Sequence, residues 1–126
     1  MELQPKIHAA YQTAKNYPDL VTQLIQLGIL SYTVDVATSA ILYRIKEGEN
    51  ILHREEHTPR TIEPWFDEQK TIKAIRDNQQ GKSDYPTFMN DIANAGVRFY
   101  EATLNGPDKR VTYIGTGGFY EEKIPL

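Results

Sequence analysis

The chain has 126 residues, of which 40% are hydrophobic and 25% are charged, and its formal net charge is -3. These values are typical of a single globular domain, 1–126. The acidic balance lacks the positive charge with which proteins bind nucleic acid, so we expect no nucleic-acid partner. The sequence has no cysteine, which excludes disulfides, thiolate metal sites and cysteine nucleophiles.

The first residues and the apolar stretches favour a cytoplasmic protein without a membrane partner. Residues 1–6 (MELQPK) lack the basic and apolar regions of a signal peptide. The apolar stretches of the chain are far shorter than the roughly 20 residues that a membrane helix needs.

The periodicity of the first half predicts two helices followed by strands. Apolar residues fall on one helical face near the N-terminus: Ile7, Ala10, Tyr11 and Ala14. Pro18 suits the first turn of a second helix, and Gly28 is placed to end it. Alternation of apolar and polar residues then predicts strands over 32–36 and 41–46, with a short third strand at 51–52.

The second half predicts the same kinds of elements. The polar residues 53–63 are expected to connect the halves. Pro64 is expected to open a third helix, which has a core face and ends at Gly81. Pro86 is expected to open a fourth helix, which ends at Gly96. Alternation and turn signals predict strands over 99–104, 111–113 and 119–124. We interpret the glycine-rich residues 115–118 between the last two as a hairpin turn, and not as a phosphate loop.

Several residues recur at one constant offset in the two halves. Tyr17-Pro18, Gly28 and Tyr32 reappear as Tyr85-Pro86, Gly96 and Tyr100. This recurrence predicts an internal duplication, with one repeat over about 3–52 and a second over about 64–126. The sequence therefore predicts an α+β fold in which an antiparallel sheet carries helices on one face and a pseudo-two-fold axis relates the halves.

Four segments of the second half form a pattern that is typical of a known family: GKSDYPTF at 81–88, AGVRFY at 95–100, TYI at 112–114 and EKIP at 122–125. Through these segments the chain resembles the YdfO-like family of bacterial and prophage proteins, which are often labelled "phage envelope protein" and whose function is unknown. Met89 and the pair Phe99-Tyr100 depart from it, since several members have Cys and Trp there. The resemblance implies no mechanism and no catalytic residues.

Tyrosines occupy matched strand positions in the two halves, and they are the candidate ligand-binding residues: Tyr32, Tyr43, Tyr100 and Tyr113. Tyr17 and Tyr85 precede matched helices. A symmetric aromatic cluster of this kind lines ligand clefts in some proteins. The simpler interpretation is that strand tyrosines belong to the core, because tyrosine is a good strand former whatever its function.

The weak candidates for metal ligands are His53 and His57, which with Glu56 form the pattern H-x-x-E-H. That pattern serves zinc peptidases only on a stable helix. Here Pro59 follows closely, so we interpret the segment as a solvated connection and expect no metal or other cofactor. Trp65 is expected to fill the gap where this connection meets the sheet, whereas an exposed Trp65 would indicate an interface.

The sequence has no nucleophile–base set, no complete metal triad and no cofactor loop, and three hypotheses for function remain. The first is a non-enzymatic interaction module that binds an unknown protein partner or itself. The alternative is a small-molecule-binding protein with a tyrosine-lined cleft between the repeats. The third is a metal-dependent hydrolase that uses His53, Glu56 and His57.

Overall fold

The structure, a computed structural model that describes residues 3–125, has the α+β architecture that the sequence predicts. Its helices are α1 (Leu3–Thr13), α2 (Tyr17–Gln26), α3 (Glu68–Gln79) and α4 (Tyr85–Asn94). Its strands are β1 (Ile29–Asp35), β2 (Ile41–Ile45), β3 (Asn50–His53), β4 (Val97–Thr103), β5 (Arg110–Gly115) and β6 (Gly118–Lys123), and a short 3-10 turn, η1 (Lys46–Gly48), precedes β3. Two helices followed by three strands thus occur twice along the chain.

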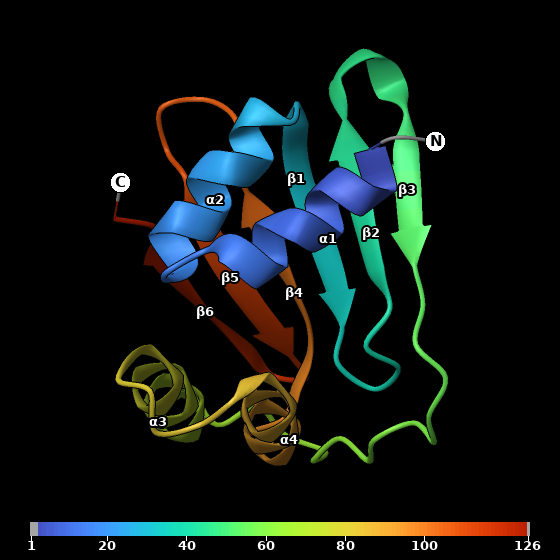
Figure 1. Ribbon diagram of the computed structural model, residues 1–126. Coiled ribbons are helices and arrows are strands. Elements are labelled where there is room, and N and C mark those ends of the chain that lie inside the picture. Colours follow the sequence, from blue (N-terminus) through green and yellow to red (C-terminus); the bar gives the residue numbers. More distant parts are fainter. Residues whose placement is uncertain (1–2, 126) are drawn as a thin grey trace.

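The strands form one antiparallel sheet in the order β3-β2-β1-β4-β5-β6 (Figure 1). The central pair joins the two halves of the chain, with Val34 of β1 opposite Tyr100 of β4. From this pair each half extends outwards in chain order, so that β3 and β6 are the two edges. The strand order is the same on both sides of the β1–β4 junction; the duplication that would explain it stays a prediction.

Local sequence signals define the ends of the matched helices α2 and α4. Asn16 and Asp84 are the N-cap residues, and their side chains accept hydrogen bonds from the backbone N–H groups of Asp19 and Thr87. A proline stands in the first turn of both helices, where its missing N–H is not needed. The predicted starts of these two helices are confirmed.

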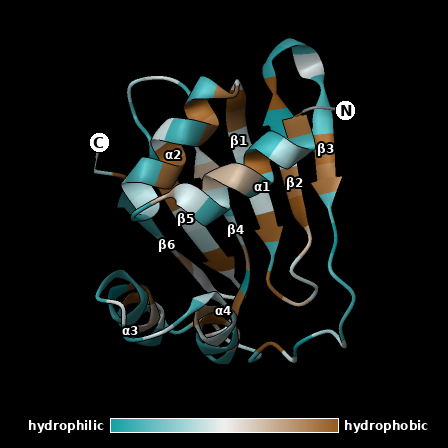
Figure 2. Ribbon diagram, viewed as in Figure 1, coloured by the Kyte–Doolittle hydropathy of each residue, from teal (hydrophilic) through white to brown (hydrophobic). Residues whose placement is uncertain are grey.

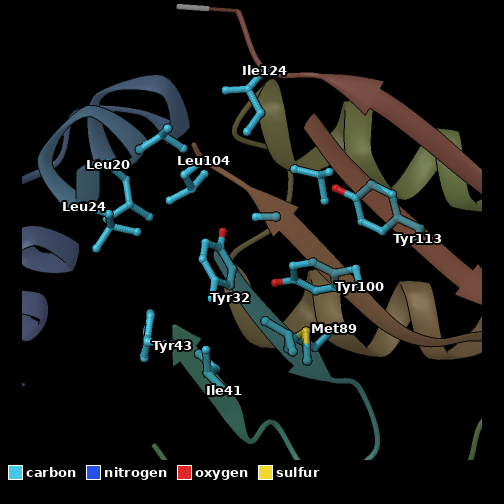
Figure 3. Packing of buried hydrophobic residues seen from close by; sticks show 14 of the residues in the cluster. Leu20, Leu24, Tyr32, Ile41, Tyr43, Met89, Tyr100, Leu104, Tyr113 and Ile124 are labelled. Carbon is cyan, nitrogen blue, oxygen red and sulfur yellow. The ribbon is translucent and has the colours of Figure 1, made fainter. Parts of the chain in front are cut away.

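The helices cover one face of the sheet, because the apolar positions of each strand alternate towards that face. The inner face carries the buried strand residues, among them Tyr32, Val34, Ile41, Tyr43, Val97, Tyr100, Ala102, Val111 and Tyr113 (Figure 3). The opposite face is partly exposed and more polar, with Arg44 donating hydrogen bonds to Ser31 and Thr33. Figure 2 shows hydrophobic segments in the strands, whereas the connection after β3 is mostly hydrophilic. Among residues 3–125, no helix has both the length and the apolar character that crossing a membrane requires.

The third helix begins at Glu68, so the predicted start at Pro64 is wrong. The backbone N–H groups of Phe66 and Asp67 donate to the carbonyls of Thr116 and Ala95, at the end of the sheet. The Asp67 side chain then caps the helix by accepting from the Lys70 N–H. Hydrogen bonds to a distant part of the chain hold residues 66–67 out of the helix.

Trp65 does not fill the gap between the connection and the sheet, because its side chain is 71% exposed. Phe66 occupies that place, and its ring packs against the glycines of the β5–β6 hairpin: a Cβ at Gly118 would lie 2.9 Å from the ring. The predicted hairpin turn at 115–118 is confirmed, since residues 116–117 join β5 directly to β6.

Gly96 is the glycine on which the packing of the connection depends. Its φ of +83° lies in the left-handed region, and a Cβ there would lie 2.3 Å from the carbonyl oxygen of Trp65. Gly106 has nearly the same φ, +81°, but has open space around it. Comparing substitutions at Gly96 and Gly106 therefore separates the cost of backbone strain from the cost of steric contact.

We expect Gly96→Ala to lower the free energy of unfolding by about 3 kcal/mol or more, because roughly 1–2 kcal/mol of backbone strain is joined by overpacking. Gly106→Ala, the matched control, should lower it by only about 1–2 kcal/mol. Equilibrium unfolding in urea measures both values. Equal losses in the two variants would show that the contact between Gly96 and Trp65 does not constrain the fold.

Candidate functional site

A cavity of about 630 Å³ lies over the inner face of the sheet, and all four helices and five of the strands contribute to its lining. Seven of the eight tyrosines of the chain line it: Tyr11, Tyr17, Tyr32, Tyr43, Tyr85, Tyr100 and Tyr113. Aliphatic side chains and one phenylalanine complete the walls: Ile7, Leu20, Val34, Ile41, Ile51, Leu52, Ile75 and Phe88. The cavity is therefore apolar in its walls, with a set of phenol hydroxyls as its main polar groups.

The sheet brings together the four strand tyrosines that the sequence singles out. Tyr32 lies opposite Tyr43 in the β1–β2 register, and Tyr100 lies opposite Tyr113 in the β4–β5 register. The ring centroids are 5.7 Å apart in the first pair and 5.3 Å apart in the second. All four residues are at most 7% exposed. Their rings thus belong to the core while the same residues form the floor of the cavity.

Two hydrogen bonds between tyrosines tie the N-terminal helices to this floor. The hydroxyls of Tyr17 on α2 and Tyr32 on β1 lie 2.6 Å apart, and the hydroxyl of Tyr43 on β2 donates to that of Tyr11 on α1 at 2.9 Å. Each bond satisfies a hydroxyl that the sheet buries. These contacts set the distance between the helices and the floor.

Tyr113 differs from these pairs. Its side chain is 7% exposed and lines the cavity, but no side-chain hydrogen bond is found for its hydroxyl among residues 3–125. The hydroxyl of Tyr100 is directed towards Tyr32 on the neighbouring strand (Figure 3). The floor of the cavity therefore presents a phenol hydroxyl that no side chain among residues 3–125 bonds, on a residue that is itself largely buried.

Burial raises the pKa of every tyrosine in the lining. It raises the pKa of Tyr17 to about 12, although the hydrogen bond with Tyr32 partly opposes the shift. Burial likewise raises the pKa of Tyr43 to about 12, against the effect of its bond to Tyr11. The pKa of Tyr113 is also raised, first by burial and then by the neighbouring phenol of Tyr17. The hydroxyls are therefore neutral hydrogen-bond donors near neutral pH.

Ionisable side chains other than tyrosine reach the cavity only from exposed positions. These are His8 on α1 and the residues at and after the end of β3: His53, Arg54 and Glu55. Amide side chains contribute from α1 and from the end of α3, namely Gln4, Asn78 and Gln79. Charge is thus confined to the rim, and the interior is neutral.

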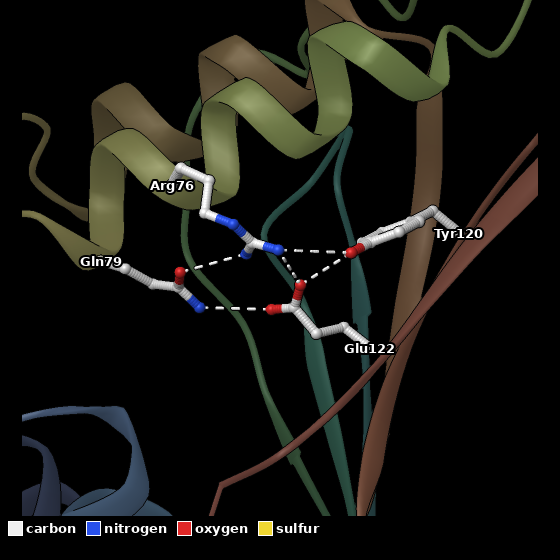
Figure 4. A network of polar contacts seen from close by, with 4 residues as sticks. All are labelled: Arg76, Gln79, Tyr120 and Glu122. Atoms are coloured by element: carbon white, nitrogen blue, oxygen red, sulfur yellow. Dashed lines mark hydrogen bonds and ion pairs between the residues drawn. The ribbon is translucent and has the colours of Figure 1, made fainter.

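A polar network next to the cavity ties α3 to the edge strand β6 (Figure 4). The guanidinium of Arg76 lies 2.7 Å from the carboxylate of Glu122, which also accepts hydrogen bonds from Tyr120 at 2.8 Å and Gln79 at 3.2 Å. Burial alone would raise the pKa of Glu122, but the bonds from Arg76 and Tyr120 outweigh burial and lower it. Because Gln79 also lines the cavity, the network fixes one part of the rim.

The structure does not assemble a metal site from His53 and His57. The segment after β3 is not helical, so the two imidazoles are not held one helical turn apart. His53 lies 3.5 Å from the carboxylate of Glu55, and the ring of His57 bonds the carbonyl of Thr58. Among residues 3–125, no group of three His, Asp or Glu side chains is placed to hold a metal ion.

Sequence reasoning did not select Tyr11 as a site residue. Its position on the apolar face of the first helix, with Ile7 and Ala10, could have indicated that its side chain faces the sheet. The sequence gives no sign that a phenol of the same sheet, Tyr43, would bond to it, because the two residues are 32 positions apart.

A comparison with protein-family models matches residues 5–118 to a family described as "Protein of unknown function (DUF1398)". The chain belongs to this family. No curated protein matches the sequence. Membership thus agrees with the expectation of a family without an assigned function, and it assigns no role to the tyrosine cavity.

We expect Tyr32→Phe and Tyr113→Phe to have different effects on stability. Tyr32→Phe removes the partner of the Tyr17 hydroxyl and should lower the free energy of unfolding by about 1 kcal/mol. Tyr113→Phe removes a hydroxyl without such a partner, so it should leave this free energy unchanged or raise it slightly. Urea unfolding of both variants checks the contrast. A loss at Tyr113 equal to that at Tyr32 would mean that the Tyr113 hydroxyl is bonded in the folded protein.

The raised pKa values also predict how stability depends on pH. Above pH 10 the unfolded chain loses phenol protons that the folded protein keeps, because the pKa values of Tyr17 and Tyr43 rise from 10.0 to about 12 on folding. Stability should therefore be constant below about pH 9, and fall as the pH rises from about 10 towards 12. Urea unfolding across this range, with tyrosinate absorbance as a second readout, tests it. Constant stability up to pH 12 would contradict the burial of the phenols.

Proposed function

We propose that the protein binds a small organic molecule in the tyrosine-lined cavity. The observation that carries the proposal is the hydroxyl of Tyr113, which belongs to a residue that is only 7% exposed, faces the cavity and has no side-chain hydrogen bond among residues 3–125. A hydroxyl that faces a largely apolar cavity without a protein partner can form a hydrogen bond with a molecule that enters the cavity. A ligand with a polar group at this position would supply that bond.

The size and lining of the cavity support the same function. Its volume of about 630 Å³ lies within the range of roughly 300–1,000 Å³ that is usual for small-molecule sites. Such sites combine apolar walls with a few convergent polar groups, as this cavity does. The paired hydroxyls of Tyr11 and Tyr43 and those of Tyr17 and Tyr32 hold two walls against the floor, which favours a preformed site.

We propose binding in preference to catalysis because of the protonation state of the lining. A general base must lose its proton near the working pH, and burial moves the phenols of Tyr32, Tyr100 and Tyr113 away from that condition. The exposed groups of His53 and Glu55 lie at the rim and not in the floor. A cytoplasmic location and a closer relation to YdfO-like prophage proteins remain predictions of the sequence.

A ligand from a metabolite library should raise the melting temperature of the wild-type protein, and a variant with a filled cavity should lose this response. Ile41→Phe adds volume to a cavity wall, whereas Leu42→Phe makes the same kind of change at the next residue of β2, on the other face of the sheet. Differential scanning fluorimetry measures the shifts, and circular dichroism shows that both variants are folded.

The expected result is a ligand shift in the wild type and in Leu42→Phe that is lost or much reduced in Ile41→Phe. No shift with any compound, or an equal shift in both variants, would contradict binding in the cavity.

The sequence also predicts an interaction module, and two exposed side chains support it as a second function. Trp65 is 71% exposed, and Phe119 on the edge strand β6 is 63% exposed. Light scattering tests this function by measuring the molar mass as the protein concentration rises. Self-association that increases with concentration in the wild type and is lost in Trp65→Ser would favour this function, if no compound binds in the cavity.

A further inference from the structure

The hydroxyls of the cavity contain more hydrogen-bond donors than the described protein groups accept. A hydrogen bond between two phenols uses one of their two protons. The Tyr17–Tyr32 pair therefore retains one free O–H, and so does the pair in which Tyr43 donates to Tyr11. With Tyr113, at least three O–H groups of the lining have no acceptor in the hydrogen bonds found among residues 3–125. A ligand that fits this surplus presents acceptors.

The distribution of charge restricts the ligand further. No carboxylate or cationic side chain lies in the floor of the cavity. Arg54 and Glu55 are exposed at its rim with opposite charges, and Arg76 and Glu122, which act on Tyr113, pair with each other. An ammonium ion inside would be desolvated without a carboxylate in the floor to pair with it. A carboxylate inside would be desolvated without a cation to pair with it. The interior thus disfavours charge of either sign.

We infer that the cavity binds an uncharged, largely apolar molecule that carries a carbonyl, ether or similar oxygen, and that this oxygen accepts a hydrogen bond from Tyr113. The inference rests on the proposed function and specifies the class of ligand. The apolar body of the molecule packs against the aliphatic wall residues, such as Leu20, Val34 and Ile75. Its oxygen lies over the floor, where the free donor of the Tyr17–Tyr32 pair is a second partner.

The neighbourhood of Tyr113 agrees with this placement. The phenol of Tyr17 lies close enough to Tyr113 to raise the pKa of Tyr113 further after burial. The phenol of Tyr113 in turn contributes to the raised pKa of Tyr100, after burial and Tyr85. Tyr17, Tyr100 and Tyr113 all line the cavity, from α2, β4 and β5 respectively. A single carbonyl oxygen, with two lone pairs, has the geometry to accept from two of them.

Four probes of similar size separate the alternatives: acetylnaphthalene, isopropylnaphthalene, naphthalenecarboxylate and naphthylmethylammonium. They share one apolar body and differ in their substituent. Acetylnaphthalene carries a neutral acceptor, isopropylnaphthalene carries no polar group, and the last two carry an anion and a cation respectively. Two-dimensional NMR titrations of the full chain give the dissociation constants and show which residues the probes contact. The proteins are the wild type, Tyr113→Phe and, as a matched control, Tyr120→Phe, which alters the tyrosine outside the lining.

We expect acetylnaphthalene to bind the wild type about three- to tenfold more tightly than isopropylnaphthalene, which is the range that one hydrogen bond supplies. Tyr113→Phe should remove this preference by weakening only acetylnaphthalene, and Tyr120→Phe should retain it. Both charged probes should bind at least about tenfold more weakly than acetylnaphthalene.

Three kinds of result would overturn the inference. If isopropylnaphthalene or a charged probe binds in the cavity as tightly as acetylnaphthalene, the ligand class is wrong although small-molecule binding stands. If the preference for the acetyl group survives in Tyr113→Phe, the assigned hydrogen bond is wrong. If none of the probes perturbs the residues of the cavity, the proposed function fails together with the inference.

Discussion

The antiparallel pairing of β1 with β4 is the constraint on which the rest of the structure depends. It joins the two halves of the chain at the centre of the sheet and sets Val34 opposite Tyr100. Because side chains alternate along a strand, this register sends Tyr32 and Tyr100 to the same face. Each half then extends outwards from the pair, and its helices cover the inner face. The cavity lies over the strands that this pair brings together.

The strand tyrosines serve packing and polarity at once, and this dual role explains the hydrogen bonds to the helices. Their rings bury large apolar areas in the core, but each ring also carries a hydroxyl into a largely apolar region. The hydroxyl of Tyr32 forms a hydrogen bond with that of Tyr17, and the hydroxyl of Tyr43 donates one to that of Tyr11. The helices α1 and α2 therefore stay at the distance that a phenol pair requires, and direct contact between the helices and the sheet does not close the space.

Local signals in the sequence predict most of the elements, since alternation and caps depend on neighbouring residues. The turn glycine Gly28 and the cap Asp84 behave as their patterns indicate. The start of α3 could not be predicted in this way, because Phe66 and Asp67 bond to Thr116 and Ala95, far along the chain. The same limit applies to the site. The sequence selects the strand tyrosines, but the volume above them depends on how far the helices stand from the sheet.

The strongest argument that the cavity is a site comes from the identity of residue 113. Phenylalanine would fill nearly the same space in β5 and pack against Tyr100 without burying a hydroxyl. The hydroxyl of Tyr113 faces the cavity and has no side-chain hydrogen bond among residues 3–125, so the packing of the core gains nothing from it. Local departures from optimal packing of this kind are expected where function requires them. A ligand that accepts a hydrogen bond from Tyr113 accounts for the hydroxyl, whereas core packing alone does not.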